Sequence, residues 1–210
     1  MIFKINKLLL SFYLLITSLL ASILFVTNFT PLYALSIKWF DLVKYTGVSA
    51  EALMEDYKTT IQYIQFPWLD KLQFKHFSMS EQGAFHFYEV KNIFLNVYAL
   101  FFMCLILGFI FYYLNKKGWL KISVDSLNYF FYLTIALIVI TLSGFYINFS
   151  MLFTKFHELF FNNNYWIFDP ITDPIILALP EEFFILCAVA IVLTTLFIAV
   201  ISKIIYSRKK

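Results

Sequence analysis

Long apolar windows dominate the pattern of hydrophobic and polar residues along the chain. Four windows contain no Asp, Glu, Lys or Arg over at least the ~20 residues that a helix needs to cross the hydrocarbon core of a bilayer. Elsewhere, charged residues interrupt the sequence too often for a membrane span. We therefore predict four transmembrane helices, near residues 8–27, 93–113, 128–149 and 183–201.

The first window follows Lys4 and Lys7, as the apolar core of a secretory signal peptide would. Its apolar run is longer than the ~7–15 residues of such a core, and no small-x-small cleavage site follows closely. We therefore expect the first helix to stay in the protein as a membrane anchor.

The composition agrees with a membrane protein. Apolar residues make up 61% of the 210 residues and charged residues 14%, compared with ~25% charged residues in soluble domains. Intrinsic disorder is excluded, because disordered chains combine low hydrophobicity with high charge. A net charge of only +3, without a clustered basic patch, argues against a nucleic-acid partner. Cys104 and Cys187 lie in apolar runs and are predicted to be buried thiols.

The charged residues predict an orientation. The N-terminus, the loop around Lys116 and the C-terminus together carry nine of the 16 basic residues but one acid, Asp125. The positive-inside rule places this side in the cytoplasm. The expected fold is an all-α membrane protein in a single domain, with both termini inside and external segments at about 28–92 and 150–182.

The first external segment predicts a helical cap. Ser49 is a suitable N-cap, Pro67 ends the helical pattern, and apolar residues recur on one face at helical spacing. These apolar residues are Leu53, Tyr57, Ile61 and Ile64. We expect this helix between the first two spans, on the outer leaflet.

The three histidines all fall in the predicted external segments. Ser78 and Glu81 have the spacing of a capping box, and a helix starting there would run into the second span. In that helix His86 and Glu89 share a face, and His86 lies about 10 Å outside the start of the span. Glu89 then either orients His86 or forms an ion pair on a solvated face. His76 has no partner pattern and is predicted to lie at the surface.

His157 is predicted at a similar height. If the third helix continues outward, His157 lies about 12 Å beyond Phe149. The Asn-rich stretch from Asn162 to Asn164 is a plausible helix stop, and an aromatic turn to Pro170 follows it. Pro180 is expected to open the fourth helix. The two histidines, with nearby carboxylates, amides and aromatic residues, form the candidate site; its supporting residues are Glu89, Asn162, Asn163, Tyr165, Trp166 and Asp169.

Several catalytic motifs are missing from the sequence. It contains no GxSxG hydrolase elbow, no P-loop or dinucleotide fingerprint, and no HExxH zinc motif. We therefore expect no bound cofactor and no metal. Two alternatives remain open: a metal-dependent membrane hydrolase, and a non-catalytic membrane protein that binds a partner through its external cap.

Two external stretches resemble a known family. Residues 80–91, which contain His86, and residues 156–169, which contain His157, together with Pro180 and Glu181, are similar to the bacterial lipoprotein intramolecular transacylases (Lit). The length and the four-span layout also agree, so the resemblance extends over most of the chain.

The resemblance implies an acyltransferase in the plasma membrane of Gram-positive bacteria, with its active site on the external face. Such an enzyme acts on lipoproteins whose N-terminal Cys carries a diacylglyceryl group, and membrane lipid surrounds it. It moves the sn-2 acyl chain to the α-amine of that Cys, which gives the lyso-form. The family's two functional histidines correspond to His86 and His157.

The chemistry is compatible with a histidine pair. A neutral imidazole can accept a proton from the attacking amine, and the departing alkoxide needs a proton. The sequence leaves open which histidine is the base and which is the acid or orienting partner. A nucleophilic histidine that forms an acyl-imidazole is a further alternative. Asn162 to Asn164, Tyr165 and Trp166 are candidate donors to the oxyanion.

Overall fold

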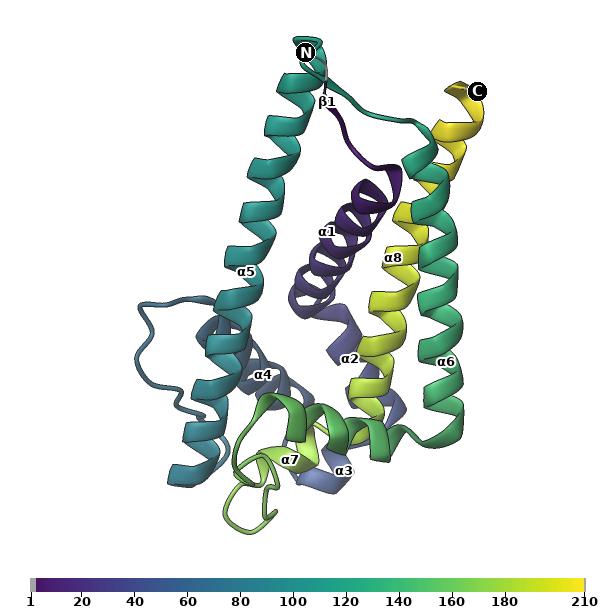
Figure 1. The fold of residues 1–210 in the computed structure, drawn as a ribbon. Helices are drawn as coiled ribbons and strands as arrows, with labels where there is room; N and C mark the ends of the chain where they lie inside the picture. The colour runs from purple at the N-terminus through teal and green to yellow at the C-terminus, as the bar shows by residue number, and fades with distance from the viewer. Residues whose placement is uncertain (1–2, 210) are drawn as a thin grey trace. The chain divides into compact units, whose positions relative to one another are not determined.

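The computed structural model of the protein describes residues 3–209 (Figure 1). Eight helices and two short strands occur in this part of the chain. In chain order they are β1 (Phe3–Lys4), α1 (Lys7–Asn28), α2 (Pro31–Trp39), α3 (Leu42–Thr46), α4 (Ala50–Gln65), α5 (Glu81–Lys116), β2 (Leu120–Lys121), α6 (Asp125–Phe160), α7 (Ile175–Ala178) and α8 (Glu181–Lys209).

Four of these helices are long and apolar enough to cross a membrane. They are α1, α5, α6 and α8, and each contains one of the four predicted spans. The mean hydropathy of their most apolar windows lies between 2.1 and 3.0. The prediction of four apolar membrane helices is therefore confirmed. The orientation with both termini inside stays a prediction.

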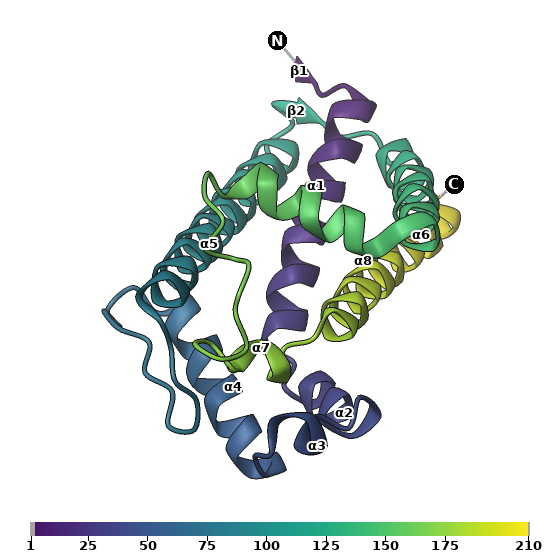
Figure 2. The same cartoon turned by 90° about the horizontal axis from the view of Figure 1, so that it is seen from below.

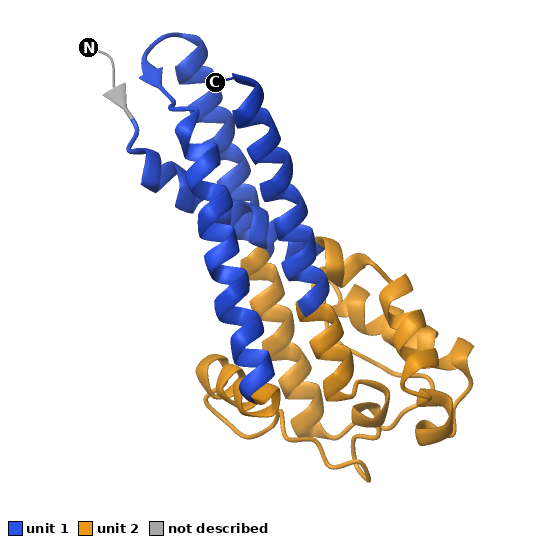
Figure 3. Cartoon of the chain, turned by 90° about the vertical axis from the view of Figure 1, so that its right-hand side faces the viewer, with its two compact units in different colours: residues 1–24, 98–147, 189–210 blue, residues 25–97, 148–188 orange. Residues whose placement is uncertain are grey.

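The chain divides into two compact units (Figure 3). Unit 1 contains residues 1–24, 98–147 and 189–210, and unit 2 contains residues 25–97 and 148–188. Unit 2 contains all three histidines.

Unit 1 packs its helices through small and polar residues. The Thr195 hydroxyl of α8 donates a hydrogen bond to the Ser22 hydroxyl of α1 at 2.9 Å. The Tyr13 hydroxyl donates to the Cys104 carbonyl at 2.7 Å. Small side chains let membrane helices approach closely, and hydrogen bonds between helices add to their packing. In this unit β1, next to the N-terminus, pairs in parallel with β2, which lies in the loop between α5 and α6.

Unit 2 has its core around α4. Helix α2 packs against α3 and α4, and α3 packs against α7 (Figure 2). The rings of Tyr33 and Tyr57 stack at 4.0 Å, and Phe183 meets both edge to face. The buried Tyr33 hydroxyl donates to the Ala178 carbonyl at 3.0 Å. This core fixes the short α7, and with it the turn that precedes α8.

Helix α4 follows its sequence pattern. The Ser49 side chain accepts from the Ala52 N–H, and the helix ends at Gln65, shortly before Pro67. The predicted apolar face is buried at Leu53, Tyr57 and Ile64 and half-buried at Ile61. The short helices α2, α3 and α7 were not anticipated, because segments of four to nine residues show too little periodicity.

Two details of the predicted helices are wrong. Ser80, not Ser78, caps α5: its hydroxyl accepts from the Gly83 N–H at 2.9 Å, whereas Ser78 donates to the Thr172 carbonyl. Helix α6 also does not continue straight to His157, because Asn148 has extended backbone angles (φ −169°, ψ 98°). The Asn148 side chain accepts from the Met151 N–H at 2.8 Å and so starts a new helical segment.

Candidate active site

His86 lies on the first turns of α5 and is buried among aromatic side chains. Only 7% of the residue is exposed. Its ring meets Phe161 edge to face at 4.7 Å and Phe168 at 5.5 Å. Burial, together with the nearby His157, lowers the pKa of His86 to about 4. The imidazole is therefore neutral at physiological pH.

His157 lies beside His86, with 6.1 Å between the two ring centroids. Its Nδ1 is 2.7 Å from the Phe153 carbonyl oxygen, which can only accept a hydrogen bond. In the neutral ring the proton is therefore on Nδ1, and Nε2 keeps a free lone pair. Burial lowers the pKa of His157, and this carbonyl acts in the opposite direction.

Trp166 covers one face of His157. The two rings stack with 4.7 Å between centroids and 29° between planes. A positive imidazolium over an indole face is favourable, because the π system carries negative charge on its face. This contact therefore stabilises the protonated form of His157 relative to the neutral form.

Asn163 organises the loop around the two histidines. Its side-chain oxygen accepts from the Tyr165 N–H at 2.9 Å, and its backbone oxygen accepts from Trp166 Nε1 at 3.1 Å. Its side-chain nitrogen donates to Glu89 Oε1 at 2.9 Å. One residue thereby links the loop that covers His157 to the helix that carries His86.

Glu89 contacts this loop and makes no hydrogen bond to His86. One carboxylate oxygen accepts from Asn163, and the other, Oε2, is buried and without a hydrogen-bond partner among the described residues. The alternative role for Glu89, an ion pair on a solvated face, is not formed among the described residues either. Lys91 instead donates to the Leu69 carbonyl and lies over the Tyr63 ring.

Asp169 and Asp173 shape the turn that follows. Asp169 is exposed, and its carboxylate accepts from the Ile171 N–H at 2.9 Å, so its role in the structure is to hold the turn. Asp173 is buried and accepts from the Ser80 N–H at 2.7 Å. A side chain at Gly83 would meet this carboxylate at 2.3 Å. The close approach of Asp173 to α5 thus requires glycine at position 83.

The other predicted residues differ in how closely they approach the site. Tyr165 is exposed, and its ring meets Phe85 edge to face at 5.7 Å. Asn162 is exposed next to the end of α6. His76 contacts Glu55 at 3.2 Å, at a surface site of its own.

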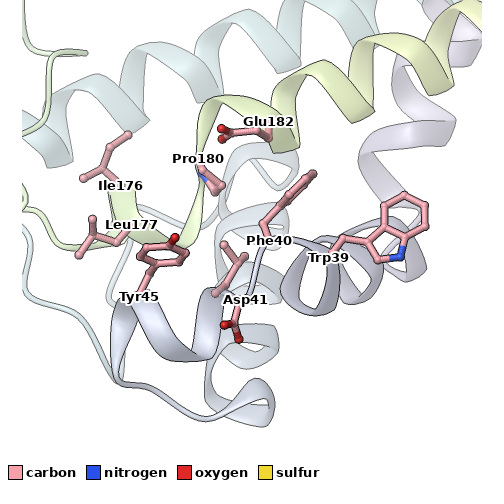
Figure 4. A pocket seen from close by; sticks show the side chains of 9 residues that line it. Trp39, Phe40, Asp41, Tyr45, Ile176, Leu177, Pro180 and Glu182 are labelled. Atoms are coloured by element: carbon pink, nitrogen blue, oxygen red, sulfur yellow. The ribbon is translucent and has the colours of Figure 1, made fainter.

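A separate groove of about 470 Å³ opens between α3 and α7 (Figure 4). Aromatic and aliphatic side chains line it, among them Trp39, Tyr45 and Leu177, with the carboxylates of Asp41 and Glu182. None of the predicted site residues lines this groove.

No group of three metal-binding side chains occurs within residues 3–209. The two neutral histidines and the half-satisfied carboxylate instead form a site suited to proton transfer. Their polar atoms lie among aromatic rings.

One family of known proteins matches most of the chain. The family model described as "Lipoprotein intramolecular transacylase Lit" matches residues 8–184. The chain belongs to this family. The matched residues include His86 and His157. They also include the membrane helices α1, from its second residue, α5 and α6, and they end in the first turn of α8.

Solved structures of a Lit protein are similar along almost the whole chain. The Lit structure from Bacillus cereus is 30% identical, with a TM-score of 0.87, and covers 96% of this chain and 93% of that one. Two variants of that protein, each with one histidine replaced, have TM-scores of 0.80 at the same identity and cover 96% of this chain and 89% and 90% of theirs. No curated protein matches the chain. These relatives are membrane-integral, and α1, α5, α6 and α8 are the transmembrane helices of this Lit-family member.

Three residues that shape the site or its supporting turns were not predicted as part of it: Phe153, Asp173 and Asn148. Phe153 offers a backbone carbonyl, which no side-chain pattern reveals. Asp173 lies far from Ser80 in the sequence, so their contact appears only in the fold. Asn148 carried a readable signal: an Asn in an apolar run is a good N-cap.

Proposed function

We propose that this Lit-family protein moves the sn-2 acyl chain of a diacylglyceryl-modified lipoprotein to the α-amine of its N-terminal Cys. The reaction takes place at His86 and His157, on the external face of the bacterial plasma membrane. The observation that carries this proposal is the pair of neutral imidazoles, 6.1 Å apart between centroids and surrounded by aromatic rings, in a member of the Lit family.

His157 is suited to be the general base. Its Nδ1–H is held by the Phe153 carbonyl, which leaves the Nε2 lone pair available to the amine. The amine nitrogen attacks the ester carbonyl carbon, the N–H proton passes to Nε2, and the C–O bond to the sn-2 oxygen breaks. The same proton then passes to that oxygen. Stacking on Trp166 stabilises the imidazolium between these two transfers.

His86 is suited to a different role. Because burial keeps its imidazole neutral, it does not act as a cationic acid near pH 7. A neutral imidazole still has one N–H, which can donate to the ester oxygen as negative charge develops. Amine and ester belong to one substrate molecule, so holding them together supplies much of the acceleration.

The test uses His86→Ala and His157→Ala in a bacterium that depends on the protein for lyso-form lipoprotein. Mass spectrometry of lipoprotein N-termini should show loss of the lyso-form with each variant. His76→Ala is the matched control and should leave the lyso-form at its normal level. An unchanged amount with either site variant would remove that histidine from the mechanism.

A further inference from the structure

We propose that Glu89 binds the α-ammonium group of the substrate's N-terminal Cys and so selects lipoproteins with a free N-terminus. The inference rests on the proposed function and adds a specificity-determining residue to it. Its starting observation is the carboxylate oxygen Oε2 of Glu89, which is buried and has no hydrogen-bond partner among the described residues.

A carboxylate oxygen in this position calls for a donor. Burying an ionised group without a compensating hydrogen bond is unfavourable. No basic side chain of the described residues forms an ion pair with Glu89, and Lys91 is engaged with the carbonyls of Pro67 and Leu69. The missing donor is therefore expected from the substrate.

The free oxygen has a fixed position. Asn163 holds the other oxygen, Oε1, at 2.9 Å and thereby limits rotation of the carboxylate. The backbone oxygen of Asn163 also accepts a hydrogen bond from Trp166, whose ring stacks on His157. The acceptor is thus tied through two residues to the proposed general base.

His86 contributes a second unpartnered polar atom on the same helix face. Its Nδ1 is buried and has no hydrogen-bond partner within residues 3–209. Glu89 follows His86 by three residues, so the two side chains are neighbours on α5. The two protein groups therefore match the two groups of the substrate. The carboxylate of Glu89 can accept from the ammonium group, and the imidazole of His86 lies beside it for the ester carbonyl.

The chemistry of the reactants agrees with this assignment. An α-amine has an ordinary pKa of about 7.7–8.0, so the substrate arrives largely as an ammonium with three donors. The ammonium releases one proton to water before it attacks, and the neutral amine still has an N–H for Glu89. The product is an uncharged amide, which Glu89 binds less well. Glu89 therefore favours substrate over product.

The test compares two unreactive probes in detergent micelles. Both are Cys peptides with a glyceryl group whose sn-2 chain is attached by an ether instead of an ester. One probe has a free α-amine, and the other is N-acetylated. Hydrogen bonds to charged groups are strong enough that the unsubstituted protein should prefer the free amine by roughly 10- to 100-fold.

Glu89→Gln should remove most of this preference and leave binding of the acetylated probe unchanged. That unchanged affinity also shows that the variant is folded. Glu51→Gln, which removes an exposed carboxylate at the start of α4, is the matched control and should keep the preference.

The outcomes separate the inference from the proposed function. If the unsubstituted protein does not convert the corresponding ester-linked lipopeptide, the proposed function fails. If it converts that peptide but shows no preference between the probes, the inference alone is overturned. The inference is also overturned if Glu89→Gln keeps the preference for the free amine, or if it weakens the binding of both probes to the same extent.

Discussion

The burial of His86 predicts that acid destabilises the fold. In the unfolded chain the imidazole takes up a proton near its ordinary pKa of 6.5, whereas in the folded protein its pKa is about 4. Between these values the unfolded state binds more protons. Stability is therefore complete above pH 6.5, falls as the pH drops toward 4, and changes no further below that through this group.

The size of the effect follows from the two pKa values. Each unit of difference corresponds to about 1.4 kcal/mol, so this histidine contributes a loss of up to about 3 kcal/mol. Because 93% of the residue is shielded from solvent, screening reduces the effect little. His157, whose pKa is also lowered, adds a loss of the same sign.

The measurement is the free energy of unfolding in detergent micelles at neutral pH and near pH 4, for the unsubstituted protein and for His86→Phe. Phenylalanine keeps a ring between Phe161 and Phe168 but cannot be protonated. Carboxylates titrate in both proteins, so the difference between their two acid-induced losses isolates the imidazole. His86→Phe should lose about 2–3 kcal/mol less stability on acidification.

The control and the refuting result are both defined by this difference. His76→Gln should lose as much stability as the unsubstituted protein, because His86 remains buried in it. If His86→Phe loses the same amount as the unsubstituted protein, then His86 does not titrate as a buried group. The argument that it stays neutral in the active site would then be wrong.

Three further predictions test the supporting structure. Gly83→Ala should destabilise the protein by about 1–2 kcal/mol in thermal unfolding, because the new Cβ would lie 2.3 Å from the Asp173 carboxylate; a gain in stability, usual for this change in a helix, would contradict the contact. Asn163→Ala should lower the rate of lyso-form production at least ~10-fold and destabilise the protein by about 1–3 kcal/mol, because it leaves the Glu89 carboxylate without its donor; normal activity would show that its loop contacts are dispensable. Tyr33→Phe should cost about 1–3 kcal/mol in unfolding by leaving a buried carbonyl unpaired, and an unchanged unfolding midpoint would argue against that hydrogen bond.

The membrane helices could be predicted because their cause is local. A bilayer requires about 20 successive apolar residues, and this requirement is written directly into windows without charge. Helix α4 was equally readable, since one face of its pattern is apolar and Ser49 marks its start. The short helices between α1 and α4 lacked both signals.

The candidate site was predictable only in part. His86 and His157 stood out as histidines in the predicted external segments. The aromatic loop after His157 was a reasonable candidate for the lining of the site. The break at Asn148, however, depends on whether its side chain caps a new helical segment or stays in the existing helix. The sequence left two roles for Glu89 open, orienting His86 or forming a surface ion pair, and could not reveal its hydrogen bond with Asn163, which lies 74 residues further along the chain.

The sequence by itself determined that this chain forms apolar helices of membrane-spanning length, and it singled out which of its few polar residues are candidates for chemistry. Periodicity and charge act over a few residues and need no folded context. Only the tertiary structure decided that His157 keeps its proton on Nδ1, that Asp173 holds the start of α5, and that one oxygen of Glu89 has no hydrogen-bond partner among the described residues. These features depend on contacts between distant segments, which compete with one another until the whole chain is packed.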